Sequence, residues 1–389
     1  MISSKKKYLK SLRFQSISCK ALLTKLFFSM FDKLLTFCDP YMQKKIKRIL
    51  ISRTDKLGDV VLTLPIIGYL KNQFPNMEIG FLCTEYTKPL VGRSDYIDEI
   101  LCWNHLQSFC TSEQIRTFQK YDCIVHVYPN KKVAFLAKKA RIQLRIGTSH
   151  RVYHWLTCNS LINLERNKTR LHEAQLNFIL FKRFGLKKVP DLKEVISYFS
   201  INTFSDEQFG TQYPNNKINI ALHPKSGGSP REWSLENFDS LIKLLSTDKY
   251  RIFITGSESE RKLIEPLLQN NPSVIDKIGS FTLDTFLDFL SSIDIFVASS
   301  TGPLHASAAL GTITIGLFPP IRPIDPIRWG TLGLKASYLV EGSETCNKCK
   351  NTKICECINR ISPDTVLKKI ESELSKHRGF QGILPPEVN

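Results

Sequence analysis

Long apolar runs are missing from this sequence, and so are internal repeats and low-complexity tracts. A membrane-spanning helix needs about 20 mostly apolar residues, so none is predicted. Without repeats, solenoid, collagen-like and mucin-like proteins are excluded. Acidic residues are also scarce, because 36 Asp and Glu face 54 Lys and Arg and leave a formal charge of +18. Such a charge indicates an anionic partner, such as a nucleic acid, a phospholipid surface or a phosphorylated small molecule.

The remaining composition is that of a folded protein. The chain has 389 residues, of which 42% are hydrophobic. At about 150 residues per domain, this length predicts two to three globular domains. Eleven cysteines occur in a chain without a recognisable targeting segment, which is typical of a reduced, cytosolic protein rather than of a disulfide framework.

The positive charge is concentrated at the N-terminus. Residues 1–48 hold twelve Lys or Arg and two acidic residues, so they carry +10 and the other 341 residues carry +8. Within residues 21–37, apolar side chains recur with helical spacing on one side of the predicted helix. Lys25 and Lys33 interrupt this stretch, which argues against a signal peptide. The extension, residues 1–45, is predicted to be a basic amphipathic helix at a membrane surface. Packing on the protein's own body or on a partner subunit is the alternative.

Four of the cysteines lie close together near the C-terminus. Their spacing is C-x2-C-x5-C-x-C, formed by Cys346, Cys349, Cys355 and Cys357. Four thiolates suit a structural zinc ion, but the second pair has an unusual spacing for a zinc ribbon. A redox-labile thiol patch and no special function are the other interpretations. None of them places these cysteines in a reaction, and no catalytic metal or other cofactor is predicted.

Short β-branched runs alternate with helical patterns along residues 46–361, which predicts parallel sheets covered by helices on both faces. A polar stretch at residues 202–216 separates two such series. The predicted strands are 46–52, 78–83, 122–127, 218–223, 251–255, 294–298 and 312–318, and the predicted helices are 60–74, 131–139, 235–245, 258–268, 283–290 and 363–376. The fold class is therefore α/β, with two doubly wound, Rossmann-like domains at residues 46–210 and 211–361. A C-terminal helix and tail follow at residues 362–389.

In open α/β sheets, ligands bind beyond the carboxyl ends of the strands, so the loops that follow the strands are the candidate binding positions. In the first series, the loop from Arg53 to Asp59 precedes a helix. Gly58 allows the backbone to come close to a ligand, and Asp59 is either a helix N-cap or a general base for a hydroxyl group.

Three loops of the second series combine small residues with charge. Residues 223–233 form a candidate phosphate cradle with Lys225 and Arg231, or a basic surface loop. Residues 299–305 present Thr301 and Gly302 at a helix start, suited to a pyrophosphate or to an ordinary capped turn. The carboxylates of residues 256–260 accept hydrogen bonds from a ribose or base, or complement a helix dipole. The spacing thus indicates an acceptor domain facing a nucleotide domain.

Several ordered signatures resemble the heptosyltransferases of glycosyltransferase family 9, which build the inner core of lipopolysaccharide. The resemblance covers about residues 46–376 and lies in Ile49–Arg53, Gly58–Pro65, Arg231–Phe238 and Ser300–Ala306, with support from Arg145–Gly147 and His172–Glu173. It implies a GT-B fold, inversion at the anomeric carbon, no metal requirement and ADP-heptose as donor.

The resemblance also assigns residues to roles. Asp59 matches the catalytic base, and Arg231 matches a basic residue on the donor phosphates, with Ser226 and Gly227 nearby. Glu258 or Glu260 would hold the adenosine. The segment that contacts pyrophosphate and sugar corresponds to Thr301, Gly302, Pro303, Leu304 and His305, and the preceding Ser300 is also expected at the donor. Acceptor contacts are expected from Arg53, Lys56 and Arg145. A basic first-domain surface is either suited to a phosphorylated acceptor or a solvated helix face, and it consists of Lys131, Lys132, Lys138, Lys139, Arg141 and Arg145.

One position departs from the family pattern. The heptosyltransferases usually carry Asp before Thr-Gly, and this sequence has Ser300. That carboxylate is associated with hydroxyls of the heptose, so a related enzyme with another nucleotide sugar, for core or surface glycan synthesis, is the alternative.

The resemblance implies a lipid A–core type acceptor and a cytoplasmic enzyme that is peripheral on the inner face of the inner membrane. A nucleic-acid-binding protein is the rival class, but the charge is concentrated in the N-terminal extension and no nucleic-acid-binding signature is present. A non-catalytic scaffold at the membrane is the third class, and retention of function after Asp59→Ala would indicate it.

Overall fold

A computed structural model describes residues 46–378 except for 167, 205–206, 215, 228–230 and 343–355. The predicted amphipathic extension, residues 1–45, therefore lies outside the described residues. The same is true of Cys346, Cys349 and Cys355, so the structure does not bear on a zinc ion at the C-terminal cysteines.

The first domain is built on a six-stranded parallel sheet with the order β3-β2-β1-β4-β5-β6. Its strands are β1 (Arg48–Ser52), β2 (Glu78–Cys83), β3 (Glu99–Cys102), β4 (Cys123–His126), β5 (Leu144–Thr148) and β6 (Ser160–Ile162). Its helices are α3 (Leu57–Val61), α4 (Leu64–Gln73), α5 (Lys88–Val91), α6 (Trp103–Leu106), α7 (Thr111–Gln119), α8 (Lys131–Lys139), α9 (Val152–Thr157), α10 (Glu173–Ile179) and α11 (Leu192–Ser197), with a short 3-10 helix, η1 (Lys182–Phe184).

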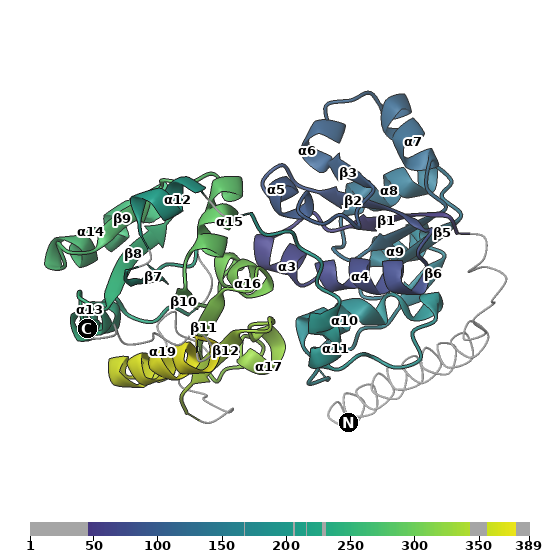
Figure 1. Ribbon diagram of the computed structural model, residues 1–389. Coiled ribbons are helices and arrows are strands. Elements are labelled where there is room, and N and C mark those ends of the chain that lie inside the picture. The colour runs from purple at the N-terminus through teal and green to yellow at the C-terminus, as the bar shows by residue number, and fades with distance from the viewer. Residues whose placement is uncertain are drawn as a thin grey trace, which may run out of the picture.

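The second domain repeats this topology, with a six-stranded parallel sheet in the order β12-β11-β10-β7-β8-β9. Its strands are β7 (Ile218–His223), β8 (Tyr250–Gly256), β9 (Ile275–Ile278), β10 (Ile295–Ser299), β11 (Ile313–Phe318) and β12 (Ala336–Val340). Its helices are α12 (Glu207–Gln212), α13 (Leu235–Leu244), η2 (Glu258–Glu260), α14 (Arg261–Asn270), α15 (Leu283–Ser292), α16 (Gly302–Ala309), α17 (Pro326–Trp329), α18 (Glu356–Asn359) and α19 (Pro363–Arg378). The predicted α/β class with two doubly wound domains is confirmed, and the domains stand side by side (Figure 1).

Side-chain alternation along β1 shows how helices cover both faces of the first sheet. Ile49 and Ile51 belong to the apolar core beneath α3 and α4. Leu50, which points to the opposite face, belongs to a separate core with residues of α6, α7 and α8. A parallel strand that is buried on both faces has to be apolar at consecutive positions, and the RILIS sequence of β1 satisfies this requirement.

The predicted helix over residues 60–74 is wrong as a single element, because the chain forms α3 and α4 with a break at Leu62 and Thr63. Pro65 lies in the first turn of α4, where its missing N–H costs nothing. The freed carbonyl of Leu62 accepts a hydrogen bond from Asn177 Nδ2 at 3.1 Å. Strands β3, β5, β6, β9 and β12 were not predicted; all are three to five residues long, so they carry little periodic signal.

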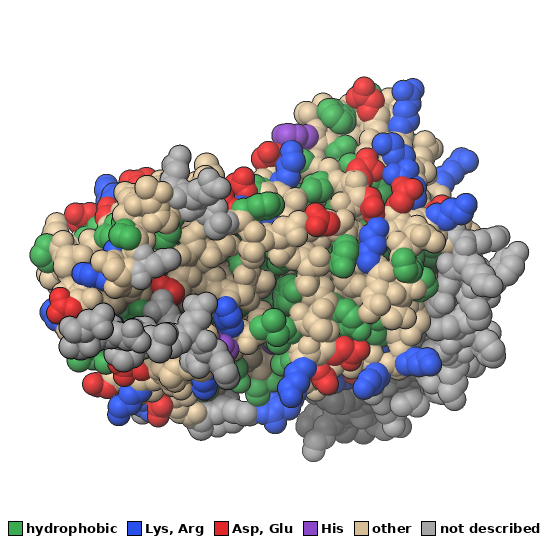
Figure 2. All heavy atoms as spheres, viewed as in Figure 1, with side chains coloured by type: hydrophobic (Ala, Val, Ile, Leu, Met, Phe, Trp, Pro, Cys, Tyr) green, Lys and Arg blue, Asp and Glu red, His purple; other side chains and the backbone are tan. Residues whose placement is uncertain are grey.

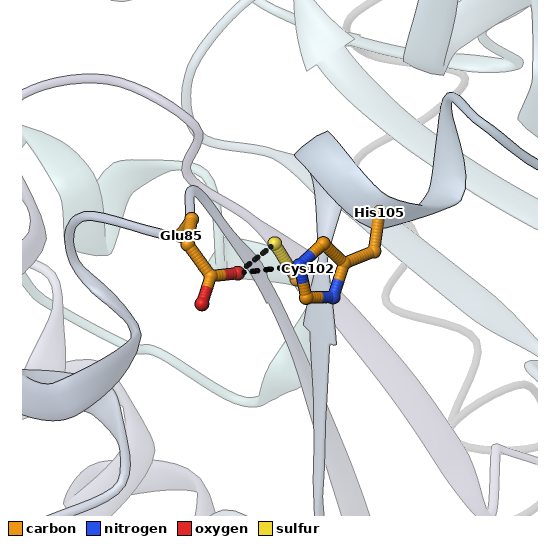
Figure 3. A group of neighbouring side chains, drawn as sticks. All are labelled: Glu85, Cys102 and His105. Carbon is orange, nitrogen blue, oxygen red and sulfur yellow. Dashed lines mark hydrogen bonds and ion pairs between the residues drawn. The ribbon is translucent and has the colours of Figure 1, made fainter.

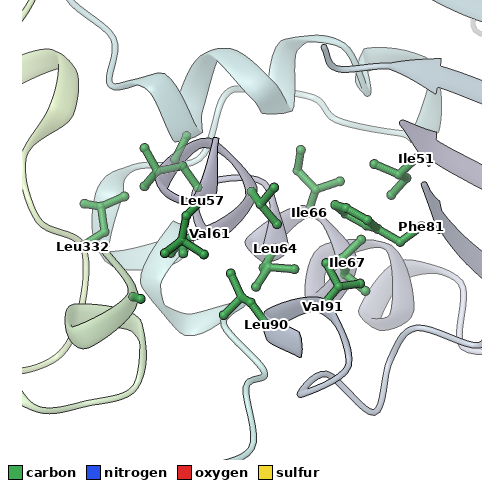
Figure 4. Packing of buried hydrophobic residues seen from close by; sticks show 14 of the residues in the cluster. Ile51, Leu57, Val61, Leu64, Ile66, Ile67, Phe81, Leu90, Val91 and Leu332 are labelled. Carbon is green, nitrogen blue, oxygen red and sulfur yellow. The ribbon is translucent and has the colours of Figure 1, made fainter. Parts of the chain in front are cut away.

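The two domains share one apolar core at their interface. Leu57 and Val61 of α3 lie in the same buried cluster as Leu304 of α16 and Leu332 of the second domain, and Figure 4 shows Leu332 approaching Leu57 and Val61. Polar contacts add to this interface. Arg93, which is buried, donates to the carboxylates of Asp284 and Asp288 on α15 at 2.8 and 2.7 Å.

Charged side chains are mixed rather than gathered on the face shown in Figure 2, where Lys and Arg alternate with Asp and Glu over the N-terminal domain. Among the described residues, no helix is both long enough and apolar enough to span a membrane.

His126, at the end of β4, generates a prediction about pH. Burial, assisted by His154 and Arg145, lowers the pKa of His126 to about 3, and neither ring nitrogen has a hydrogen-bond partner among the described residues. Below the unfolded-state pKa near 6.5, the unfolded chain binds a proton at His126 that the folded chain does not. The free energy of unfolding is therefore expected to fall with decreasing pH, by ~1.4 kcal/mol per pH unit from this group.

The measurement is urea unfolding between pH 7.5 and pH 4.5, followed by circular dichroism. His126→Phe keeps an aromatic ring beside His154 and lacks the titrating group, so its stability should fall less steeply with acid. Equal slopes in the wild type and the variant would contradict the prediction.

Candidate functional site

The site lies where the N-terminal ends of α3 and α16 meet between the domains. Gly58 and Gly302 make this approach close: a Cβ at residue 302 would lie 2.9 Å from Leu57 Cβ and 3.2 Å from the Gly58 backbone nitrogen. A Cβ at residue 58 would lie 2.9 Å from a ring carbon of His305. Only glycine fits such distances without displacing the opposite helix. As a result, the loops after β1 and β10 face the same cleft.

Asp59 lies in the first turn of α3, and Lys56 occupies the N-cap position. The interpretation of Asp59 as an N-cap is therefore wrong, and the predicted loop up to residue 59 has already become helix at Leu57. The Asp59 carboxylate pairs with the guanidinium of Arg53, and its side chain is 19% exposed. This pairing leaves Asp59 partly open to the cleft while Arg53 holds one of its oxygens.

Arg53 is buried and serves two carboxylates. It pairs with Asp59 through Nη2 and lies 2.9 Å from Asp55 Oδ1 through Nε. Burial raises the pKa of Asp55 to about 7, with a further contribution from the Asp59 charge and against the opposing effect of Arg53. One buried guanidinium cannot balance two neighbouring negative charges, so Asp55 binds a proton more readily than an ordinary aspartate.

Across the cleft from Asp59, the segment that contains Arg231 is hydrogen-bonded to the end of β10. The Trp233 backbone N–H donates to Ser299 Oγ at 3.0 Å, and the buried Trp233 indole donates to the Ile361 carbonyl at 2.9 Å. Ser234 caps α13, its Oγ accepting a hydrogen bond from Asn237 N at 3.3 Å. These anchors direct Arg231 toward a cavity of about 400 Å³. Its lining includes Lys56, Gly58, Asp59, Arg166, Arg231, Ser300, Thr301, Gly302, His305 and Trp329.

Thr301 caps α16, because its Oγ1 accepts a hydrogen bond from Leu304 N at 3.2 Å. This bond satisfies one of the free N–H groups of the helix, and the others leave the positive end of α16 at the cleft. Leu304 is buried in the core, whereas His305 lines the cavity. Burial, together with the nearby His172, lowers the pKa of His305 to about 3, so its imidazole is neutral at physiological pH.

A second cavity, of about 630 Å³, continues from the first along the second domain. Its lining includes Ser226, Gly227, Glu258, Glu260, Phe281, Phe286 and Pro303, and it shares Lys56, Thr301 and Gly302 with the first. The predicted donor-binding residues at positions 226, 227, 258 and 260 are therefore brought together. Tyr86 of the first domain also reaches this cavity.

Two amides of the predicted phosphate cradle, those of Ser226 and Gly227, are already engaged. Ser226 N donates to Glu232 Oε1 at 2.9 Å, and Gly227 N donates to Glu260 Oε1 at 2.8 Å. These two backbone amides are therefore not free to bind a phosphate, as a cradle at residues 223–233 would require. Glu260 also closes a capping box with Ser257, so its first function is to hold this loop, while Glu258 pairs with Arg261.

A third cavity, of about 860 Å³, lies on the first domain. Asp59 and Arg166 line both this cavity and the one of about 400 Å³, so the two spaces meet at these residues. Its lining combines the basic side chains of Arg53, His150, Arg151, Arg166 and Lys168 with the carboxylates of Asp55, Asp59 and Glu165. Of these basic residues, only Arg53 is predicted from the sequence, because the others follow β5 and β6, which are too short to show a clear pattern.

Arg145, predicted on the acceptor side, is not among the residues that line these three cavities. Its guanidinium donates to the carbonyls of Ile142 and Thr157 within its own domain. His172 and Glu173, which contributed to the family resemblance, connect the domains instead. His172 Nε2 lies 2.9 Å from the Gly330 carbonyl, and Glu173 pairs with Arg166 and Arg328. Cys357 is buried in the core of the second domain.

The glycine contact at the cleft predicts a specific effect on stability. Gly302→Ala places a methyl group against Leu57 and the Gly58 backbone, and overpacking of this kind costs about 1–3 kcal/mol. We expect a lower midpoint in thermal unfolding. Gly210→Ala is the matched control, because nothing lies within 4 Å of a Cβ at that helical position, and it should be neutral or slightly stabilising. Equal midpoints for Gly302→Ala and the wild type would contradict the contact.

Comparisons with known proteins agree with this architecture. A glycosyltransferase of Haemophilus influenzae described without a named substrate is 29% identical over 299 residues, which is 73% of this chain and 86% of that protein. Lipooligosaccharide heptosyltransferase 2 of the same species is 21% identical and covers 71% of this chain and 84% of its own length.

Among solved structures, a glycosyltransferase family 9 protein from Veillonella parvula superimposes with a TM-score of 0.70 at 19% identity, over 85% of this chain and 97% of that one. ADP-heptose LPS heptosyltransferase II of Escherichia coli gives a TM-score of 0.68 at 16% identity, over 85% and 99%. The predicted GT-B fold is confirmed by these neighbours. Residues 113–358 match the family model of glycosyltransferase family 9 (heptosyltransferase). The chain is a glycosyltransferase and belongs to family 9.

Proposed function

We propose that this enzyme transfers a heptose from ADP-heptose to a hydroxyl group of a lipopolysaccharide inner-core acceptor, with inversion and without a metal ion. The observation that carries the proposal is the position of Asp59. Its carboxylate lines both the cavity that Arg231 and the α16 N-terminus share and the larger basic cavity of the first domain. A carboxylate at this junction can reach a hydroxyl that enters from one side while a leaving group departs on the other.

Asp59 acts as the general base in this proposal. It accepts the proton of the acceptor hydroxyl as the oxygen attacks the anomeric carbon, and attack from the face opposite the leaving group inverts that carbon. Arg53 holds one Asp59 oxygen, which leaves the other available for the acceptor. Proton transfer to a positioned side chain accelerates such reactions by about 10²–10⁴-fold.

Positive groups of the second domain stabilise the leaving nucleoside diphosphate. Arg231 lies beside Thr301 and Gly302, where the α16 N-terminus presents backbone N–H groups. Fixed donors of this kind stabilise negative charge as it develops on the departing phosphate. The loop at Ser226 and Gly227 contributes shape rather than free amides, because Glu232 and Glu260 already accept its hydrogen bonds.

The cavity of about 630 Å³ is suited to the nucleoside. It combines carboxylates that accept hydrogen bonds from a ribose with the aromatic rings of Phe281 and Phe286, against which a base can stack. The E. coli structural neighbour is named for ADP-heptose, which supports adenosine as the base.

The basic cavity of about 860 Å³ is suited to an acidic acceptor. Arg151, Arg166 and Lys168 line it, and such side chains pair with phosphates and carboxylates like those of a lipid A–core acceptor. The names of the relatives refer to lipooligosaccharide and lipopolysaccharide, which supports this class of acceptor. A lipid-anchored acceptor supports the further proposal that the enzyme works at the cytoplasmic face of the inner membrane, attached through the basic extension of residues 1–45.

Ser300 favours a second candidate, which is transfer of a different sugar by the same mechanism. It lines the cavity of about 400 Å³ in which the donor sugar would lie. A serine offers a short neutral hydroxyl where the resemblance leads one to expect a carboxylate for the heptose hydroxyls. The proposed base and the proposed phosphate contacts are the same for both donors.

The first test concerns Asp59. Asp59→Asn keeps the size of the side chain and removes its basicity, so turnover with ADP-heptose and a heptose-deficient lipopolysaccharide should fall by ~10²-fold or more. Binding of ADP should persist, because we assign the nucleotide to Arg231 and to the nucleoside cavity, which Asp59 does not line. Asp248→Asn, at an exposed turn of the second domain, is the control and should retain full turnover. More than a tenth of the wild-type rate in Asp59→Asn would overturn the assignment of the base.

A second test identifies the nucleotide. Thermal unfolding in the presence of ADP, UDP, GDP or CMP reports specific binding, because a ligand that binds only the folded state raises the midpoint. Stabilisation by ADP alone is expected. Stabilisation by UDP or GDP instead would support the second candidate, and steeply salt-dependent DNA binding without any nucleotide effect would contradict both.

A further inference from the structure

Glu85, Cys102 and His105 form a compact group of potential metal ligands outside the cleft cavities. Glu85 lies in the loop after β2, Cys102 is the last residue of β3, and His105 lies on α6. Their ligand atoms all lie within 4.8 Å of one another, and Figure 3 shows the three side chains pointing toward a common centre. From this geometry we propose a binding site for a zinc-class divalent ion.

The sheet topology brings these residues together. Strands β2 and β3 are parallel neighbours with Cys83 opposite Cys102, so the loop after β2 and the helix after β3 start at the same edge. The Glu85 backbone N–H donates to Asn104 Oδ1 at 3.0 Å, which fixes the loop against α6. The arrangement thus rests on strand pairing and on a contact of the Glu85 backbone, neither of which uses the three ligand atoms.

The distances between the three side chains are slightly shorter than those of a coordination shell. Glu85 Oε2 lies 2.9 Å from Cys102 Sγ and 3.0 Å from His105 Nε2. Zinc bonds of ~2.0–2.3 Å to oxygen, nitrogen and sulfur need ligand atoms somewhat farther apart than that. Small outward movements of two exposed side chains, Glu85 and His105, would therefore admit the ion.

The donor set selects the class of metal. A thiolate, an imidazole and a carboxylate suit Zn²⁺ or its substitute Co²⁺, whereas Mg²⁺ and Ca²⁺ prefer oxygen ligands alone. When the ion binds, the Cys102 sulfur–hydrogen bond is replaced by a metal–sulfur bond and the proton leaves to solvent. Glu85 contributes a carboxylate oxygen and neutral His105 contributes the Nε2 lone pair. The three ligands leave a fourth position on the solvent side, which water can occupy.

If the proposed function holds, a metal at this site should affect binding of the nucleotide-sugar donor. Tyr86 directly follows Glu85 and lines the cavity of about 630 Å³ that we assign to the nucleoside. A metal that joins Glu85 to α6 and β3 holds the Tyr86 loop in place. Loading of the site is therefore expected to strengthen donor binding, while the reacting atoms remain remote from the metal.

The test is Co²⁺ titration of the reduced full-length protein, with stoichiometry from native mass spectrometry and thiolate-to-metal absorption in the near ultraviolet. Cys102→Ser and His105→Gln should each bind one Co²⁺ fewer than the wild type and lose the corresponding absorption. Cys110→Ser, an exposed thiol nearby, is the matched control and should behave like the wild type. Because each variant is compared with the wild type, ions held by the C-terminal cysteines cancel.

His105 is an exposed side chain, so its substitution keeps the test valid even where Cys102→Ser fails to fold. Equal stoichiometry and absorption in the wild type and His105→Gln would overturn the proposal. ADP binding measured on the same samples separates the two hypotheses. Retained ADP binding without a difference in Co²⁺ refutes the metal site alone, whereas a difference in Co²⁺ without ADP binding supports the metal site and refutes the proposed donor.

Discussion

The close contact between α3 and α16 is the constraint on which the site depends. Gly58 and Gly302 let the two helices approach until a single methyl group would collide with the opposite chain. In sequence, α3 comes after β1 and α16 after β10, which are inner strands of their sheets. The N-terminal end of each helix therefore lies at the domain boundary. The carboxylate of Asp59 and the positive end of α16 consequently face one space, although they are 243 positions apart in sequence.

The apolar core makes this contact a property of the whole molecule. Leu57 and Val61 belong to the same buried cluster as Leu304 and Leu332, so the interface continues the cores of both domains. Arg93 with the carboxylates of α15 and Glu173 with Arg166 and Arg328 add charged contacts around it. Arg93 and Glu173 are buried, whereas the side chains of Asp284 and Arg166 are 62% and 43% exposed, so each pair joins a buried group to a partner in contact with water.

Charge is distributed unevenly around Asp59. Arg53 lies buried behind it and is shared with Asp55, whose pKa burial raises to about 7. Arg231 and the α16 N-terminus lie on the donor side, and Arg166 stands at the junction with the basic cavity. Asp59 thus lies between the positive groups of the donor side and a first-domain cavity where arginines and a lysine lie beside Asp55 and Glu165.

The sequence by itself determined the α/β class, the duplicated doubly wound plan and the loops that carry Asp59, Arg231 and Thr301. These are local properties, because strand hydrophobicity, helix caps and glycine positions each depend on a few consecutive residues. It did not determine the break between α3 and α4, the five short strands, or the basic lining from Arg151 to Lys168. Only the tertiary structure decided that Ser226 and Gly227 have their amides occupied, that Arg145 lies away from the cleft and that Glu85, Cys102 and His105 converge. Each of these depends on contacts between segments distant in sequence, which no local pattern records.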